Sequence, residues 1–89
     1  MTPSRPSLLQ FPCYFPLKVI GKNVEEFEIQ VMSIVHKHVI EADTAQCRRR
    51  LSAGNKYLAL TISFMAQSQE QLEAIYTELK ALELVMVML

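Results

Sequence analysis

The sequence has few of the residues that mark common binding loops and secreted scaffolds. Its only glycines are Gly21 and Gly54, and its only cysteines are Cys13 and Cys47. Two separated glycines do not form the glycine-rich cradle of a phosphate-binding loop, so we expect no nucleotide cofactor. Two cysteines are too few for the disulfide framework of a small secreted domain, and we expect both thiols to be buried or half-buried.

Long hydrophobic runs and an excess of one charge are also absent. No apolar run reaches the roughly 18 to 20 residues that a membrane span needs, and residues 1–12 lack the apolar centre of a secretory signal. Nine basic and nine acidic residues cancel, so the chain as a whole has no net field to attract a polyanion. We therefore expect a cytoplasmic protein that does not contact a membrane and whose main partner is not a nucleic acid.

What the chain does have is a clear succession of hydrophobic periods. With 89 residues, of which 51% are hydrophobic, it can build one modest core. Between residues 15 and 89 the periods follow the order strand, helix, strand, strand, helix, strand, which is typical of the ferredoxin-like split βαβ sandwich. We predict an α+β domain over residues 13–89, with a four-stranded antiparallel sheet and two helices on one face. Residues 1–12 are expected to be an extended or disordered segment.

The first half of this pattern contains a strand and a helix. The strand runs through residues 17–20 and stops at Gly21. Asn23 is the expected N-cap of the helix, with Glu26 three residues later in a capping-box arrangement. An apolar stripe with spacings of three and four should face the sheet, and it consists of Val24, Phe27, Val31, Ile34, Val35 and His38.

The second half begins with a predicted hairpin. Residues 44–51 and 57–66 form its strands, and residues 52–56 form its loop. Alternation along the second of these strands turns Leu58, Leu60, Ile62 and Phe64 toward the helices. Ser68 should cap the next helix with Gln71 at the third helical position, and its buried stripe is Leu72, Ile75, Tyr76, Leu79 and Leu82. The last strand, residues 84–89, is apolar throughout, so its buried side stays open.

The two edge strands of the predicted sheet differ in charge. Right-handed crossovers place the first and third strands in the centre and leave the second and fourth at the edges. The second strand carries three arginines, which discourage random pairing, whereas the last strand has no charge after Glu83 and should be covered. We predict a homodimer, or a monomer covered by residues 8–11. The candidate interface residues are Met65, Val85, Val87 and Leu89.

Residues with binding or catalytic chemistry are few. Arg48 and Arg50 share one side of their strand and are candidates for anion binding, the alternative being a solvated protective edge. His36 and His38 point about 200° apart on a helix, so we predict no metal site. Cys13 lacks a nearby base and oxyanion donor, which favours a packing role. We predict no catalytic residue and no cofactor.

Other functions of this fold need motifs that the chain lacks. An acylphosphatase needs an arginine in the loop after the first strand, and residues 20–24 contain none. A copper chaperone needs a paired-cysteine loop. An RNA-recognition domain needs stacking aromatics on the open face of the third strand, where only Tyr57 stands, so RNA binding is a weak alternative.

Several stretches of the chain resemble one known family. Residues 8–21, Leu-Leu-Gln-Phe-Pro-Cys-Tyr-Phe-Pro-Leu-Lys-Val-Ile-Gly, resemble the opening of the YbeD-like family of small uncharacterised bacterial proteins. The likeness continues through the turn at 52–57, the strand at 58–61, residues 71–72 and 76–79, and the end at 85–89. Two departures are the basic residues 48–50 before the turn, and Val39-Ile40, where many relatives have Ala-Pro.

The resemblance implies a ferredoxin-like fold similar to ACT regulatory domains. It implies no established enzymatic activity, so no catalytic residues carry over, and the family's genes often lie near lipoate-attachment genes. We therefore expect a non-enzymatic regulatory or interaction domain with an unidentified protein partner. The alternative is an ACT-like sensor that holds a small molecule at a subunit interface near Gly21, Lys22 and Asn23.

Overall fold

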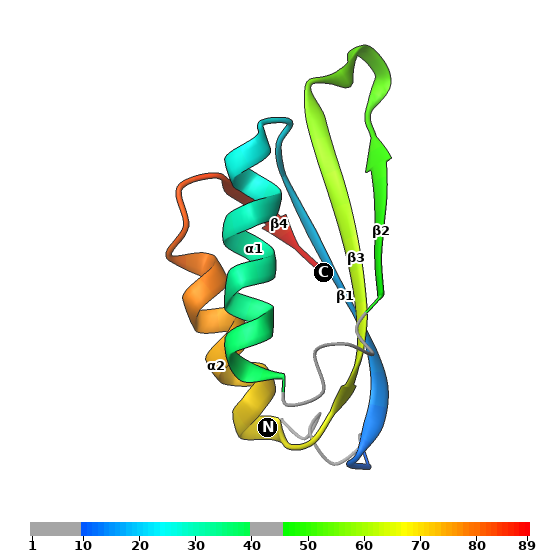
Figure 1. Ribbon diagram of the computed structural model, residues 1–89, viewed down its shortest axis with the longest axis vertical. Helices are drawn as coiled ribbons and strands as arrows, with labels where there is room; N and C mark the ends of the chain where they lie inside the picture. The colour runs from blue at the N-terminus through cyan, green and yellow to red at the C-terminus, as the bar shows by residue number, and fades with distance from the viewer. Residues whose placement is uncertain (1–9, 40–45) are drawn as a thin grey trace, which may run out of the picture.

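A computed structural model describes residues 10–39 and 46–89 of the chain. Its elements are β1 (Cys13–Lys22), α1 (Glu25–His38), β2 (Gln46–Leu51), the short 3-10 helix η3 (Ala53–Asn55), β3 (Tyr57–Ala66), α2 (Gln69–Lys80) and β4 (Val85–Met88). The four strands form one antiparallel sheet in the order β2-β3-β1-β4, and both helices lie on the same side of it (Figure 1). The predicted βαββαβ ferredoxin-like fold is confirmed, and so are the two edge strands.

The register of the sheet is set by its two long central strands. β1 and β3 pair along their whole length, from Cys13 opposite Ala66 to Lys22 opposite Tyr57. β2 pairs with the first part of β3, whereas β4 pairs with β1 only near Val19 to Gly21, with a register shift between Ile20 and Gly21. β1 is therefore longer than the predicted strand at both ends.

Pro16 stands in the middle of this central strand. The backbone N–H of Lys18 donates toward Leu89, on the β4 side of the sheet, and residues two apart on a strand point their N–H groups the same way. The nitrogen of Pro16 therefore points to the β4 side, beyond the last β4 bond. Its missing N–H breaks no ladder hydrogen bond, which explains how a proline is accommodated here.

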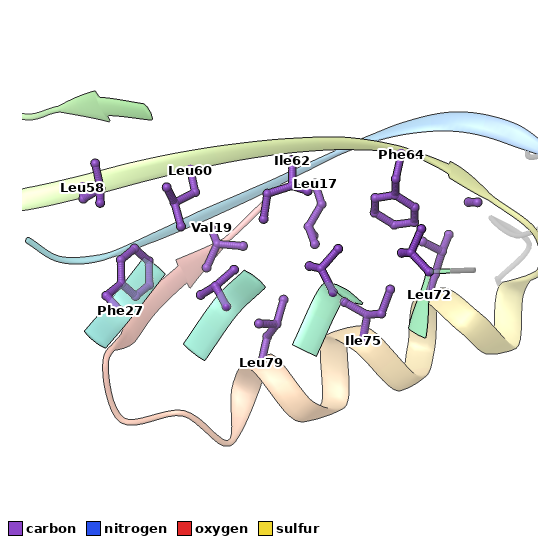
Figure 2. Packing of buried hydrophobic residues seen from close by; sticks show 14 residues of the cluster. Leu17, Val19, Phe27, Leu58, Leu60, Ile62, Phe64, Leu72, Ile75 and Leu79 are labelled. Carbon is purple, nitrogen blue, oxygen red and sulfur yellow. The ribbon is translucent and has the colours of Figure 1, made fainter. Parts of the chain in front are cut away.

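The hydrophobic core lies between the sheet and the two helices. Leu58, Leu60, Ile62 and Phe64 of β3 are buried, which confirms the predicted facing of this strand. Figure 2 shows these side chains, with those of Leu17 and Val19, pointing toward the helical layer. The helices contribute Phe27, Val31 and Val35 from α1 and Leu72, Ile75 and Leu79 from α2. Ile34, Tyr76 and Leu82 of the predicted stripes are only partly buried.

The two helices begin differently. Ser68 caps α2 as predicted, because its Oγ accepts a hydrogen bond from the Gln71 backbone N–H at 3.1 Å. The predicted Asn23 cap of α1 is wrong, since Val24 occupies the N-cap position and no side chain caps it. Asn23 instead donates from its side chain to the Asn55 carbonyl at 2.9 Å, and its backbone N–H donates to the Lys56 carbonyl at 3.1 Å.

The remaining predictions concern the ends of elements and the loops between them. Val24 was expected in the buried stripe but is 40% exposed, because the helix begins one residue later. The hairpin loop lies at residues 52–56 as predicted, with Gly54 and Asn55 in the left-handed region. Residues 44 and 45 of the expected strand, and residues 1–9 of the expected N-terminal segment, lie outside the described residues. The division between residues 12 and 13 therefore stays a prediction.

Candidate functional site

The side of the sheet away from the helices carries the most distinctive group of exposed side chains. We call it the open face; it is formed by the even-numbered residues of β1 and β2 and the odd-numbered residues of β3. In the described part of the chain both helices lie on the other side (Figure 1). The open face is therefore the natural place to look for a binding surface.

Basic residues stand in neighbouring rows across the open face. In one row Arg48 lies opposite Thr61, and Thr61 lies opposite Lys18. In the next row Arg50 lies opposite Ala59, which lies opposite Ile20. Arg48 and Arg50 thus share this side, as the alternation predicted.

Two lysines join the arginines: Lys18, which sequence analysis did not single out, and Lys22, which it assigned to a small-molecule site at the turn. Lys18 and Lys22 are exposed, and the even-residue alternation of β1 places both on the open face. A net charge of zero does not reveal this basic surface, because the sum of the charges does not say which element carries them. The signal was present in the sequence, since no residue of the four strands is acidic.

Arg49 belongs to the opposite side of the sheet. It pairs with buried Leu60 in the register, and its Nη1 donates to Oε1 of Glu28 on α1 at 3.1 Å. This ion pair joins the edge strand β2 to the helical layer. The three consecutive arginines therefore divide between two sides, two for the open face and one for α1.

Exposed apolar side chains lie next to the basic rows, on β4. Val87 pairs with Ile20, and Leu89 exchanges backbone hydrogen bonds with Lys18, so both lie on the open face. Val87 is 45% and Leu89 is 66% exposed, and Met86 at the register shift is 53% exposed. These exposed side chains form an apolar border at the edge of the sheet.

The four predicted interface residues do not come together. Val87 and Leu89 are neighbours on the open face, whereas Met65 lies at its far end, opposite Tyr14. Val85 pairs with buried Gly21 and packs against the core, on the helix-facing side. Residues 8–11 were expected to cover β4; residues 8 and 9 lie outside the described residues, and Phe11 packs against the core.

The turn after β1 holds the residues predicted for a small ligand. A Cβ atom on Gly21 would lie 2.3 Å from the Leu84 carbonyl oxygen and 2.4 Å from the Phe27 ring, so packing accounts for this glycine. Lys22 is exposed at the end of β1, and Asn23 binds the hairpin turn. A hollow beside the turn is lined in part by Lys22, Glu26 and Glu83, so carboxylates outnumber the single cation there.

A second apolar group, exposed except for half-buried Met32, lies between α1 and β2. It lines a groove of about 760 Å³ and includes Val24, Ile29, Met32 and Leu51. Glu28 and Arg49, the ion pair described above, form part of the same lining. This groove is on the helix-facing side and is separate from the open face.

The end of α1 is bound to α2 through one carboxylate. Glu78 accepts from Lys37 Nζ at 2.6 Å and lies 2.5 Å from Nε2 of His38. The hydrogen bonds from Lys37 and then from His38 hold the pKa of Glu78 below its usual value. His38 thus faces α2, whereas His36 is exposed. Among residues 10–39 and 46–89, no three side chains of His, Cys, Asp or Glu lie close enough to hold a metal ion.

The two cysteines are free and half-buried, as predicted. Cys47 lies opposite Ile62, on the helix-facing side of β2. Burial, and after it the nearby Glu28 carboxylate, raise the pKa of this thiol above its usual value. A raised pKa leaves little thiolate at neutral pH, so the environment of Cys47 suits packing better than nucleophilic chemistry.

These features define a small ferredoxin-like α+β domain with a basic sheet face that neither α1 nor α2 covers. In the part of the chain that the structure describes, neither helix has the length and apolarity to cross a membrane. A family model described as a protein of unknown function, DUF493, matches residues 6–89, and the chain belongs to this family. The resemblance to small uncharacterised bacterial proteins is thereby confirmed.

Similar proteins come from several bacteria. The chain is 40% identical over 88 residues to UPF0250 protein RSc0326 of Ralstonia nicotianae, covering 99% of this chain and 91% of that protein. It is 39% identical to a UPF0250 protein of Paraburkholderia phytofirmans, covering 93% of both chains, and 38% identical to one of Neisseria gonorrhoeae, covering 97% and 94%. The family has no known function, and nothing in these names indicates catalysis.

Proposed function

We propose that this protein is a non-enzymatic interaction domain, regulatory in role, that acts in the bacterial cytoplasm. The observation that carries the proposal is the exposed apolar border of Met86, Val87 and Leu89 along an edge strand. Edge strands present unpaired backbone N–H and C=O groups, and apolar side chains beside them favour contact with another chain. Binding, rather than chemistry, makes use of such a surface.

The simplest partner for this border is a second copy of the chain. Two β4 strands can pair across a two-fold axis, which would satisfy their outer backbone groups and continue the sheet from one copy into the next. The apolar group of Val87 and Leu89 in one copy would then lie beside the same group in the other copy. A homodimer of this kind is the first form of the proposed interaction.

A charged residue in the border tests this dimer. Val87→Lys should convert a dimer to a monomer in light scattering over a wide concentration range, because it places an uncompensated charge at the contact. Ile29→Lys is the matched control, since Ile29 is equally apolar, 59% exposed and on α1. It should leave the dimer intact, and circular dichroism checks that both variants fold.

Two outcomes contradict this part of the proposal. If Ile29→Lys, and not Val87→Lys, dissociates the dimer, the contact lies in the groove between α1 and β2. If the wild-type chain is a monomer and stays unchanged when residues 1–12 are removed, neither a homodimer nor a covering N-terminal segment explains the border. A protein partner of another kind would then be needed.

The small-molecule sensor is the second reading, and fewer observations favour it. The N–H groups of Asn23 and Val24 already donate to the carbonyls of Lys56 and Lys22. Glu26 and Glu83 would repel a carboxylate ligand at this turn. A thermal-shift panel of amino acids, lipoate, octanoate and nucleotides should give no saturable shift. A saturable shift that Lys22→Ala abolishes would favour the sensor.

A further inference from the structure

Positive and negative charge are separated between the two layers of this domain. Within residues 10–39 and 46–89, the strands carry five basic residues and no acidic one; the five are Lys18, Lys22, Arg48, Arg49 and Arg50. The helices and the turn after α2 carry Lys37 and Lys80 against seven carboxylates, which are Glu25, Glu26, Glu28, Glu70, Glu73, Glu78 and Glu83. A chain with no net charge therefore has one basic side.

The four cations of the open face are close enough to act together. Arg48 and Arg50 are two residues apart on one strand, or about 7 Å, and Arg48 and Lys18 are two strands apart, or about 10 Å. These spacings are within or near a Debye length at physiological salt, so their potentials add. None of the four forms an ion pair with a carboxylate of the described residues, whereas Arg49 on the other side does.

Apolar surface lies among these cations. Ile20 and Ala59 separate Arg50 from Val87 in one row of the sheet. A shallow hollow of about 160 Å³ opens on this row, lined by Ile20, Arg50, Leu51, Ser52, Tyr57 and Ala59. A ligand that fits this surface must offer apolar groups to the hollow and negative charge to its rim.

The arrangement of aromatics disfavours single-stranded nucleic acid as this ligand. Tyr14 and Tyr57 stand near opposite ends of the β1–β3 ladder, eight residues and about 26 Å apart. Between them the centre of β3 presents Ala59 and Thr61, on which bases cannot stack. Recognition of unpaired bases relies on stacking platforms near the centre of such a sheet.

We infer that the open face binds an acidic, amphipathic segment of a partner protein, with apolar side chains on Ile20 and Ala59 and carboxylates on Lys18, Lys22, Arg48 and Arg50. This inference rests on the proposed interaction function and names the chemistry of the partner. Charge complementarity of this kind raises association rates and selects against basic partners. The acidic helical layer of the domain itself does not compete from within the same molecule, because it lies on the opposite side of the sheet.

A peptide titration followed by NMR of the isotope-labelled protein tests the inference. The probe is an acidic peptide of eight residues, Glu-Ser-Leu-Ser-Glu-Ser-Leu-Ser, about 26 Å long when extended, in which Leu and Glu stand two residues apart and so share one side of the chain. We expect saturable shifts at Lys18, Ile20, Arg50 and Tyr57, and a dissociation constant that rises with salt. The same peptide with Gln for Glu should bind about tenfold more weakly.

Charge reversal at one position of the face supplies the matched variant. Arg50→Glu should weaken the Leu–Glu peptide about fivefold, because it replaces attraction by repulsion at the hollow. Lys80→Glu changes the net charge by the same amount on exposed α2 surface and should leave the affinity unchanged. Equal weakening by both variants would show a non-local charge effect and overturn the inference.

The remaining outcomes separate this inference from the proposed function. Shifts confined to the edges of β2 or β4 would mean strand addition, which overturns the open-face inference and leaves an interaction domain in place. An oligothymidylate of equal charge that binds more tightly, at the same residues, would make the face a nucleic-acid surface and overturn both. The absence of saturable shifts with any probe would overturn the inference, while the light-scattering test of β4 would still stand.

Discussion

The two faces of the β1–β3 ladder are built by the same alternation and differ completely in chemistry. Leu17, Val19 and Leu60 are at most 1% exposed and fill the core, while Lys18, one position away, points to solvent. A shift of one residue in register would exchange the two faces. The same strands therefore fill the core on one side and present basic side chains to solvent on the other.

The largest effect should come from removing packing on the helix-facing side. Leu60→Ala should lower the free energy of unfolding by about 2 to 5 kcal/mol, through lost burial and the cavity left behind. Thr61→Ala, on the open face, should cost much less. Denaturant titration measures both variants, and equal losses would mean that the facing assigned to β3 is wrong.

A smaller loss of stability should follow from adding one methyl group at Gly21, where β1 packs closely against Leu84 and Phe27. Gly21→Ala would force Leu84 or the Phe27 ring to move, at a cost of about 1 to 3 kcal/mol. Gly54→Ala is an informative control, because nothing lies within 4 Å of the added atom but φ is 81°. It should cost about 1 to 2 kcal/mol through backbone strain alone. A neutral Gly21→Ala in thermal denaturation would contradict the close packing of β1 on α1.

The smallest effect should appear only in acid, within the helical layer. Because Lys37 and His38 lower the pKa of Glu78, the folded state binds fewer protons there than the unfolded state. The resulting stability is present above the ordinary value of 4.5 and is lost as pH falls through the lowered folded value.

Unfolding measured between about pH 6 and pH 3 checks this contribution. Glu78→Gln should lose less stability with falling pH than the wild-type chain does, because it has no carboxylate to protonate at this position. Identical slopes for the Glu78→Gln variant and the wild-type chain would mean that the contact with Lys37 and His38 contributes nothing in solution.

Local patterns in the sequence predicted the features that depend on residues close together in the chain. Alternation along 57–66 was sufficient to face β3, and the cap of α2 involves residues three apart, Ser68 and Gln71. The cap of α1 was mispredicted because Asn23 has a competing partner, Asn55, 32 residues away. No local pattern reports such a contact.

The sequence predicted only part of the candidate site, because the rest depends on contacts between distant residues. Alternation placed Arg48 and Arg50 on one side, but their proximity to Lys18 depends on two strand pairings through β3. Periodicity could not predict which side chains of β4 face the helices, because all its residues are apolar and its register against β1 shifts between Ile20 and Gly21. Val85 is partly buried and Val87 is exposed because of that shift, which periodicity does not report.

The proline in β1 has a consequence for aggregation. Among the described strands none pairs with β1 on its β4 side from Cys13 to Leu17, so this part of a central strand is itself an edge. The backbone nitrogens of Tyr14 and Pro16 point to that side, and Pro16 has no N–H to donate. A foreign strand that added there would leave a carbonyl without its partner. Pro16 therefore discourages another strand from pairing with this uncharged part of β1, as the arginines discourage pairing at β2.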